Sequence, residues 1–451
     1  MKITFMLAAK TYMYLPLFLA KEKGIFRSVF EAKRIKEEIE IEVCEGDDDA
    51  VDQMLDFNRH ARKNKLDEMA IAISDPTSIL RQHKGFDNKT DIKVVGKLID
   101  KLPFWVICPY NEALNDNSNN GYMDIKELKA QKLYTPNSSY ITANSCSSQL
   151  SKANSYKVKQ VEFSEEIERC INDSESIALT GDLNLMVKKK IENKICIYSH
   201  MANNNDESIA TAIITSRYVC KKYEDILALI LESIQKAIFI IYSSPEIATE
   251  VCYKISSEID DYTMSNEEEQ KQKTKIIISI INSDHLYPMS TDISFSDWKK
   301  TVNYYLSHDV NIFKQMGDTN LPTRANENEP YVASIYQKMF FKNPAHIAEK
   351  NIVKDFGVDC NTFDKEIPYH IVKKLINNIL YFLRRDFWYI ICFILFIAVV
   401  YYVIYQIFYN ANGDTKSDMG LLIGVLSLIW GVLSGFRVFP PMKKRSNYDG
   451  N

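Results

Sequence analysis

Hydrophobic residues in the first third of the chain form short apolar runs that alternate with longer amphipathic stretches. Strand-like runs occur at 3–8, 39–43, 69–73, 92–98 and 104–108. Helix-like stretches lie between the first four of these runs, at 16–23, 48–64 and 76–84. This alternation predicts a mainly parallel sheet with helices covering both faces.

A second, smaller set of strand and helix patterns spans about 110–195, and the pattern is helical from about 205 to 380. The clearest helical run is "EDILALILESIQKAIFIIY". The chain is therefore expected to be an α/β protein with two lobes that form a clamshell. We assign lobe 1 to 1–109, lobe 2 to 110–195, and the return to lobe 1 with a helical segment to 196–380. Ligands of open α/β sheets bind beyond the carboxyl ends of the strands, here between the lobes.

Two apolar runs near the C-terminus, 387–409 and 420–439, predict a pair of transmembrane helices. Aromatic residues stand at both ends of the first run, as is typical of membrane interfaces. Basic residues flank the hairpin on its outer sides, whereas the turn between the runs holds only Lys416. The flanking residues are Lys373, Lys374, Arg384, Arg385, Arg437, Lys443, Lys444 and Arg445. This distribution predicts a multi-pass protein of the cell membrane with both termini in the cytosol, and the start of the chain does not resemble an export signal.

The second apolar run carries small residues at steps of three and four. They are Gly420, Gly424, Ser427, Gly431, Ser434 and Gly435. Small residues on one helix face allow close backbone contact. We expect this face to pack within the hairpin, with a membrane-protein partner or a second copy of the chain as alternatives.

Composition narrows the classes of function. The formal net charge of -4 argues against a nucleic-acid partner, which would require a concentrated basic face. The nine cysteines and seven histidines are scattered singly, so neither a disulfide framework nor a metal site is expected. No nucleophile–base pattern or phosphate-binding glycine loop is visible, so we expect no cofactor and no enzymatic activity.

Four stretches resemble the solute-binding family that includes the sulfonate-binding and thiamine-pyrimidine-binding proteins. They are "YLPLFLAKEKGIF" (14–26), "IAISDPTSILRQHKG" (71–85), and the segments 123–150 and 223–254. The resemblance covers about 1–310 and implies the type II periplasmic-binding fold with a small-molecule ligand. Two features depart from the family: extra residues at 27–37, and the added C-terminal hairpin. The cysteine-rich motif of the branch that makes the thiamine pyrimidine is also missing from the sequence.

Candidate ligand-binding residues of lobe 1 lie where strands end and helices begin, because helix N-termini favour anions. Tyr12 and Tyr14 follow the first strand and either stack on a flat ligand or pack under the first helix. Ser74, Asp75 and Thr77 surround the start of a helix that has proline in its first turn. These residue types are equally typical of helix caps.

Lobe 2 supplies the remaining candidates. A polar helix start carries Asn137, Ser138, Ser139 and Tyr140. Thr180 and Asp182 end a strand, with a turn aspartate as the alternative role of Asp182, and His200 follows the last strand of the lobe. A lone histidine is more often structural than a ligand contact. Together these groups predict a small ligand that is anionic or aromatic.

The sequence therefore predicts a membrane-anchored, cytosol-facing protein that closes on a small ligand. Closure would be relayed to the transmembrane hairpin or to a membrane partner. Two alternatives remain open at this point: a substrate-binding component of an ABC-type importer for a sulfonate or thiamine precursor, and an enzyme similar to thiamine-pyrimidine synthases.

Overall fold

The chain divides into two compact units, Met1–Glu366 and Ile367–Asn451. The computed structural model describes residues 1–82, 91–112, 130–137, 141–201, 208–308 and 329–358. All of these lie in the first unit. The predicted membrane spans 387–409 and 420–439 lie outside the described residues.

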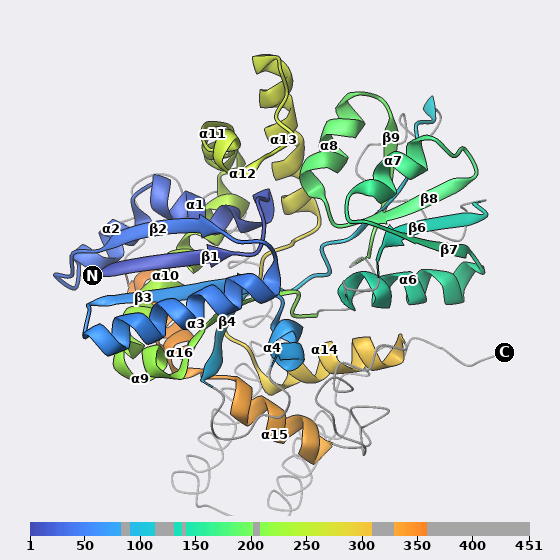
Figure 1. Ribbon diagram of the computed structural model, residues 1–451. Coiled ribbons are helices and arrows are strands. Elements are labelled where there is room, and N and C mark those ends of the chain that lie inside the picture. Colours follow the sequence, from blue (N-terminus) through green and yellow to red (C-terminus); the bar gives the residue numbers. More distant parts are fainter. Residues whose placement is uncertain (83–90, 113–129, 138–140, 202–207, 309–328, 359–451) are drawn as a thin grey trace, which may run out of the picture. The chain divides into compact units, whose positions relative to one another are not determined.

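Sheet 1 has the strand order β2-β1-β3-β10-β4 (Figure 1). Its strands are β1 (Lys2–Leu7), β2 (Glu38–Val43), β3 (Glu68–Ser74), β4 (Ile92–Ile99) and β10 (Thr211–Ser216). Strand β1 pairs in parallel with β2 and β3, whereas β10 runs antiparallel to β3 and β4. The four strands predicted at 3–8, 39–43, 69–73 and 92–98 are thus confirmed within one residue at each end.

Sheet 2 has the order β7-β6-β8-β5-β9. Its strands are β5 (Trp105–Pro109), β6 (Lys132–Pro136), β7 (Lys157–Val161), β8 (Ser176–Thr180) and β9 (Ile195–His200). Strand β6 is parallel to β7 and β8, and β5 is antiparallel to β8 and β9. Both sheets therefore share one topology. The fourth strand in each order, β10 in sheet 1 and β5 in sheet 2, is antiparallel to its neighbours and lies next to a segment that crosses between the sheets. The predicted α/β architecture with two sheets is confirmed.

The helices lie between and after these strands (Figure 1). They are η1 (Tyr12–Tyr14), α1 (Leu15–Glu22), α2 (Ile25–Glu31), α3 (Asp47–Asn64), α4 (Pro76–Gln82), α6 (Ile141–Asn154), α7 (Glu165–Ile171), α8 (Leu183–Ile191), α9 (Arg217–Lys222), α10 (Glu224–Ser243), α11 (Pro245–Lys254), α12 (Ser256–Ile259), α13 (Glu267–Ser283), α14 (Phe295–Ser307), α15 (Glu329–Met339) and α16 (Asn343–Val358).

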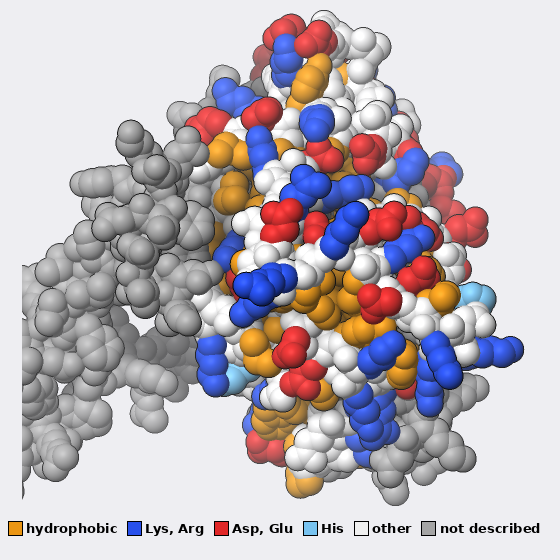
Figure 2. All heavy atoms as spheres, turned by 90° about the vertical axis from the view of Figure 1, so that its left-hand side faces the viewer, with side chains coloured by type: hydrophobic (Ala, Val, Ile, Leu, Met, Phe, Trp, Pro, Cys, Tyr) orange, Lys and Arg blue, Asp and Glu red, His pale blue; other side chains and the backbone are white. Residues whose placement is uncertain are grey.

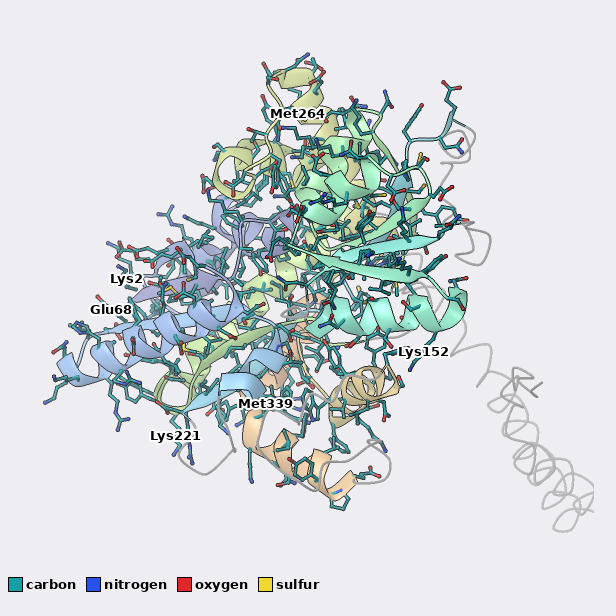
Figure 3. All side chains as sticks on the ribbon, turned by 45° about the vertical axis from the view of Figure 1, so that its right-hand side comes forward. Lys2, Glu68, Lys152, Lys221, Met264 and Met339 are labelled. Atoms are coloured by element: carbon teal, nitrogen blue, oxygen red, sulfur yellow. The ribbon has the colours of Figure 1, made fainter. Side chains whose placement is uncertain are left out.

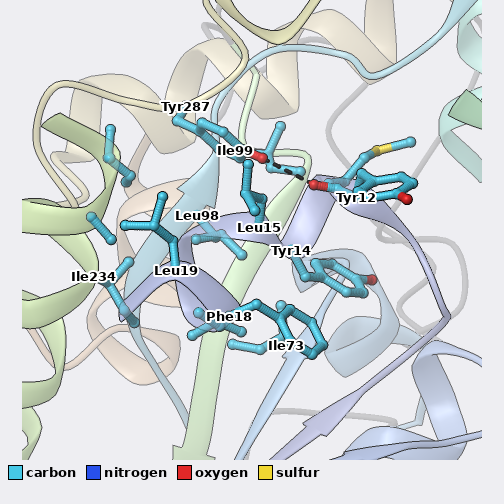
Figure 4. Packing of buried hydrophobic residues seen from close by; sticks show 14 of the residues in the cluster. Tyr12, Tyr14, Leu15, Phe18, Leu19, Ile73, Leu98, Ile99, Ile234 and Tyr287 are labelled. Carbon is cyan, nitrogen blue, oxygen red and sulfur yellow. Dashed lines mark hydrogen bonds between the residues drawn. The ribbon is translucent and has the colours of Figure 1, made fainter. Parts of the chain in front are cut away.

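Both faces of sheet 1 are buried at β1, β3 and β10, because alternate residues of these strands enter different hydrophobic clusters. The edge strand β2 packs its isoleucines against one cluster and carries glutamates on its other face. On β1, Phe5 belongs to the cluster that contains α1 and α10, whereas Met6 belongs to the cluster that contains Met54 of α3. Figure 4 shows Phe18 and Leu19 of α1 among residues of β3, β4 and α10. Strand register therefore fixes which helices cover each face.

One helix of the described part of the chain, α10, is long and apolar enough to cross a membrane. In its most apolar 18-residue window, however, 67% of the residues are buried inside the protein. Helix α10 contacts α1, α2 and α16. It is therefore the central helix of the core under sheet 1, as its burial on all sides indicates.

The crossovers between the sheets fall at different points from the predicted lobe boundaries, 109 and 195. Strands β5 and β9 both belong to sheet 2, so the chain leaves sheet 1 before Trp105 and returns after His200. The two crossing segments hydrogen-bond to each other. The Met201 N–H donates to the Phe104 oxygen at 2.9 Å, and the Ala210 N–H donates to the Ile99 oxygen at 3.0 Å.

The amino ends of the parallel strands in sheet 1 carry surface charge pairs. Lys2 and Glu68 are register partners on β1 and β3 (Figure 3), and Lys2 Nζ lies 2.8 Å from Glu40 Oε2 on β2. Basic and acidic side chains are interspersed over the face in Figure 2, so neither sign forms a continuous patch there. The segments that follow the carboxyl ends of β1, β2 and β3 line a cleft instead.

Candidate functional site

A cleft of about 700 Å³ lies at the carboxyl ends of the parallel strands of both sheets. Sheet 1 contributes the segments after β1 and β2 and Asp75 after β3; sheet 2 contributes Phe163 and Ser164 after β7 and Asp182 after β8. The crossovers contribute Phe104 and its neighbours. The full lining is Ala8, Ala9, Lys10, Thr11, Met13, Tyr14, Val43, Cys44, Glu45, Gly46, Asp47, Asp48, Asp75, Pro103, Phe104, Thr142, Phe163, Ser164, Gly181, Asp182, Ala210, Thr211, Asp261 and Tyr262.

Hydrogen bonds through Asp75 link the two sides of the cleft. Its backbone N–H donates to Asp47 Oδ1 at 2.8 Å, and its Oδ1 accepts the Thr77 N–H at 2.8 Å. Thr142 Oγ1, on helix α6 beside sheet 2, lies 3.4 Å from Asp75 Oδ2 and 2.9 Å from the hydroxyl of Tyr305. Asp75 therefore ties the end of β3 both to the start of α3 and to α6.

Asp182 occupies the corresponding position on sheet 2. As the N-cap of α8, its Oδ1 accepts the Leu185 N–H at 3.0 Å, and its Oδ2 accepts the Ser164 hydroxyl at 2.6 Å. Burial raises the pKa of Asp182, although these hydrogen bonds and the charge of Lys273 act in the opposite direction. Its carboxylate thus holds the ends of β7 and β8 together at the cleft wall.

A buried ion pair positions the segment that carries Asp261 and Tyr262. Lys273 Nζ on α13 contacts Asp260 Oδ2 at 2.6 Å and donates to the Tyr262 oxygen at 2.7 Å, and neither charged side chain of the pair is exposed. Burial lowers the pKa of Lys273, while the Asp260 carboxylate opposes that shift. On the cleft side, Asp261 Oδ1 meets Lys10 Nζ at 2.9 Å.

Aromatic side chains supply much of the remaining lining. Burial raises the pKa of Tyr14, and the charges of Asp47 and Asp75 add to that shift, so the phenol stays protonated. Phe163 is 37% exposed. Gly181 packs closely against Phe104, because a Cβ atom there would lie 3.1 Å from the phenylalanine ring and the ring would have to shift slightly.

The structure brings three of the sequence-predicted site residues into the cleft: Tyr14, Asp75 and Asp182. Ser138, Ser139 and Tyr140 lie outside the described residues. The other candidates, Tyr12, Ser74, Thr77, Asn137, Thr180 and His200, are not among the lining residues. Several of them support the lining instead, since the Thr180 hydroxyl accepts the Asp182 N–H at 3.1 Å and Ser74 Oγ lies 3.3 Å from the Asp47 oxygen.

Tyr12 and His200 are buried structural residues. Tyr12 accepts the Tyr287 hydroxyl with its backbone oxygen at 3.2 Å (Figure 4), and its own hydroxyl lies 3.4 Å from Gln270 Nε2. His200 stacks on Trp105 with ring centroids 5.1 Å apart, and its Nδ1 lies 3.6 Å from Asp284. Burial lowers the pKa of His200 in spite of that carboxylate.

Sequence reasoning missed most of the acidic and aromatic lining. The run "VCEGDD", 43–48, follows the second predicted strand directly, so its position at a strand end was a usable signal. Phe163 likewise ends the strand-like run "YKVKQVEF". Asp261 carried no such signal, because it lies in a charged stretch, 260–275, that the sequence alone assigns to a solvated helix or loop.

Comparisons with known proteins returned structural matches only. No family model and no curated protein matches the chain. A putative sulfonate-binding protein of a Methylobacillus flagellatus ABC transporter aligns with a TM-score of 0.48 at 12% identity, covering 80% of this chain and 96% of that one. The nitrate-binding protein NrtA of Synechocystis gives 0.47 at 10% identity, covering 82% and 91%. A Candida albicans protein with the generic periplasmic binding protein fold gives 0.42 at 14%, covering 76% and 95%.

The buried carboxyl group of Glu166 leads to a prediction about how the stability of the protein depends on pH. This fully buried carboxyl on α7 has its pKa raised from 4.5 to about 7, chiefly by burial and also by the charge of Asp182. The folded chain therefore holds more protons than the unfolded chain between these values, so stability falls as pH rises from about 4.5 to 7. Wild type should lose up to about 3 kcal/mol of unfolding free energy over this pH range through Glu166, and the Glu166→Gln variant should not show this loss. Thermal unfolding of the full chain across this pH range measures it.

The exposed neighbour Glu168 on the same helix provides the matched control. Glu168→Gln should retain the wild-type pH dependence of the unfolding midpoint. Equal slopes for wild type and Glu166→Gln would contradict the assignment.

A second prediction concerns the buried pair behind Asp261 and Tyr262. Lys273→Met leaves the Asp260 carboxylate buried without its cation, which should destabilise the protein by about 3–5 kcal/mol. The double variant Lys273→Met/Asp260→Asn removes both charges and should recover most of that loss. Chemical denaturation of wild type, Lys273→Met, Asp260→Asn and the double variant measures the coupling, and additive single effects would show that the contact contributes little.

Proposed function

We propose that this protein binds a small organic cation in the cleft between its two sheets, and that its C-terminal hairpin holds it at the cytosolic side of a membrane. The single observation that carries the ligand class is the charge of the cleft. Six carboxylates line it, namely Glu45, Asp47, Asp48, Asp75, Asp182 and Asp261, against one amine, Lys10.

The balance of charge favours a cationic ligand. Lys10 is already paired with Asp261, so it offsets little of the remaining negative charge. Asp47, Asp75 and Asp182 accept hydrogen bonds within the protein, whereas Glu45 and Asp48 are exposed in the cleft, and carboxylates in a confined site act on the charge of a ligand. The anionic ligand expected from the helix N-termini is disfavoured, because carboxylates already occupy the positions where an anion would approach those termini.

The apolar part of the lining favours an organic cation over a bare metal ion. Tyr14, Phe104, Phe163 and Tyr262 bring aromatic rings to the same cleft as the carboxylates. Aromatic faces attract ammonium and amidinium groups, and they bury the carbon skeleton to which such groups are attached. This retains the aromatic part of the ligand class predicted from the sequence.

The side chains that line the cleft are better suited to ligand binding than to catalysis. No histidine is among the lining residues, and the one cysteine, Cys44, has its pKa raised to about 11 by burial and neighbouring carboxylates. A protonated thiol is a poor nucleophile at neutral pH. Among the described residues that line the cleft, therefore, no activated nucleophile with a base accompanies the acidic groups.

The membrane component of the proposal rests on sequence. The runs 387–409 and 420–439 have the length and composition of spans, and the basic residues lie outside the hairpin. A ligand that binds more tightly to one arrangement of the two sheets would shift the protein toward it, and the chain could relay that shift to the hairpin. An importer component would instead expose the cleft on the outer face.

Ligand class is tested with two exposed aspartates on the same helix. Asp48 lines the cleft, whereas Asp52 lies one turn further along α3 and outside the lining. Simple amines, quaternary ammonium compounds and aminopyrimidines should include probes that raise the thermal midpoint of the full chain. For such a probe we expect Asp48→Asn to weaken affinity about two- to fivefold, from roughly 0.5–1 kcal/mol, and Asp52→Asn to leave it unchanged.

Nitrate and methanesulfonate serve as matched anionic probes. Stabilisation by these anions, with no response to any cation, would overturn the proposed ligand class while leaving a binding function in place. No response to either set would remove the support for a solute-binding cleft.

Membrane topology is tested with single introduced thiols. The seven cysteines of the described chain are all buried, so they give little background in the folded protein. An impermeant maleimide should label Ser417→Cys, in the turn between the predicted spans, in intact cells. It should label Ser28→Cys, exposed on α2, only after permeabilisation. Labelling of Ser28→Cys in intact cells would instead favour the importer component.

A further inference from the structure

Three metal-ligating side chains meet outside the cleft. Asp292, His346 and Glu349 each offer one ligand atom, and these atoms all lie within 4.8 Å of one another. Asp292 lies in the loop before α14, whereas His346 and Glu349 belong to α16. None of them lines the cleft.

The loop that carries Asp292 is fixed on both sides. The Thr291 oxygen accepts the Lys97 N–H of β4 at 2.9 Å, and the Ile293 oxygen accepts the Tyr336 hydroxyl at 2.6 Å. Asp292 Oδ1 is itself a buried atom without a hydrogen-bond partner in the described part of the protein. Burying a carboxylate oxygen in this way is unfavourable unless a proton or a cation satisfies it.

The helix on the other side is equally well anchored. The Phe341 N–H just before α16 donates to the Val94 oxygen at 2.8 Å, and Asn351 Nδ2 donates to Glu232 Oε2 of α10 at 2.9 Å. His346 and Glu349 are three residues apart and therefore share a helix face. Both are exposed, so their side chains can adjust to a bound ion without moving the backbone.

We propose that Asp292, His346 and Glu349 bind a divalent transition metal, with Zn²⁺ as the best fit. One imidazole and two carboxylates are common zinc ligands, whereas Mg²⁺ and Ca²⁺ prefer oxygen ligands alone. Zinc–ligand bonds are about 2.0–2.2 Å long, so the three atoms must draw together slightly around the ion. The exposed side chains leave the fourth position to solvent. The ion joins the loop before α14 to α16 and neutralises the Asp292 carboxylate, whose Oδ1 is buried.

The test uses the metal-free full-length chain in mild detergent, titrated with Co²⁺ and then with Zn²⁺. We expect one Co²⁺ per chain with visible d–d bands, and displacement by Zn²⁺. His346→Ala and Glu349→Gln should each weaken binding at least tenfold. His60→Ala, which removes an exposed histidine from α3, should leave it unchanged. Zinc should raise the thermal midpoint of wild type and of His60→Ala, but not that of Glu349→Gln.

Three results would overturn the site. They are no cobalt bound, equal affinity in wild type and Glu349→Gln, or the near-ultraviolet charge-transfer absorption of cobalt bound to thiolates, which would assign the metal to cysteine. Because Glu349 is exposed, its replacement by glutamine leaves the fold available as a reference even if the histidine variant is unstable. The cleft does not enter this measurement, so its outcome is independent of the proposed ligand.

Discussion

The site depends on the pairing of the two crossovers between the sheets. The chain leaves sheet 1 after β4 and returns to it as β10, and the two passages hydrogen-bond through Phe104 with Met201 and Ile99 with Ala210. Because each passage is adjacent to the antiparallel strand of its sheet, the parallel strands of both sheets end at the same cleft. The topology thus determines where the cleft lies, whichever residues line it.

The acidic character of the cleft follows from how its helices begin. Asp47 and Asp48 lie in the first turn of α3, and Asp182 caps α8, where negative charge is stabilised by the helix dipole and the free backbone N–H groups. The same residues line the cleft. The residues that stabilise the starts of these helices therefore also make the cleft acidic, so a capping role is compatible with the proposed binding role.

The sequence predicted four of the five strands of sheet 1, because β1, β3 and β4 are largely buried apolar runs and β2 alternates glutamate with branched aliphatic residues. It missed β10, which lies in the part of the chain that was expected to be helical. It predicted the location of the site through strand ends, which gave Tyr14, Asp75 and Asp182 correctly as cleft residues. The sequence could not assign β5 to the second sheet, since "FWVIC" looks the same in either lobe. Which sheet it joins depends on pairing with residues as distant as His200.

Tyr12 and His200 show a second reason why the predicted and observed cleft residues differ. Tyr12 follows a strand and His200 ends one, as ligand-binding residues would, and periodicity does not reveal which way such a side chain points. Tyr12 turns into the core because η1 directs it toward Gln270 of α13, more than 250 residues later (separation 258). His200 is paired in register with Trp105 on β5. Long-range packing thus decides whether a strand-end residue faces the cleft, and no local pattern encodes it.

Buried ionisable groups lie behind the cleft wall, and each of them depends on neighbouring polar or charged groups. Asp182 is buried with Ser164, Glu166 shares its surroundings, and Lys273 needs Asp260. Buried charges of this kind contribute little net stability, and removing one member leaves the other exposed to the full cost of desolvation. A cation bound between the sheets would add the missing positive charge to an acidic wall and so stabilise the bound form. Under the proposed function, binding of a cation would therefore stabilise the acidic wall, and ligand binding would be coupled to the stability of the crossover region.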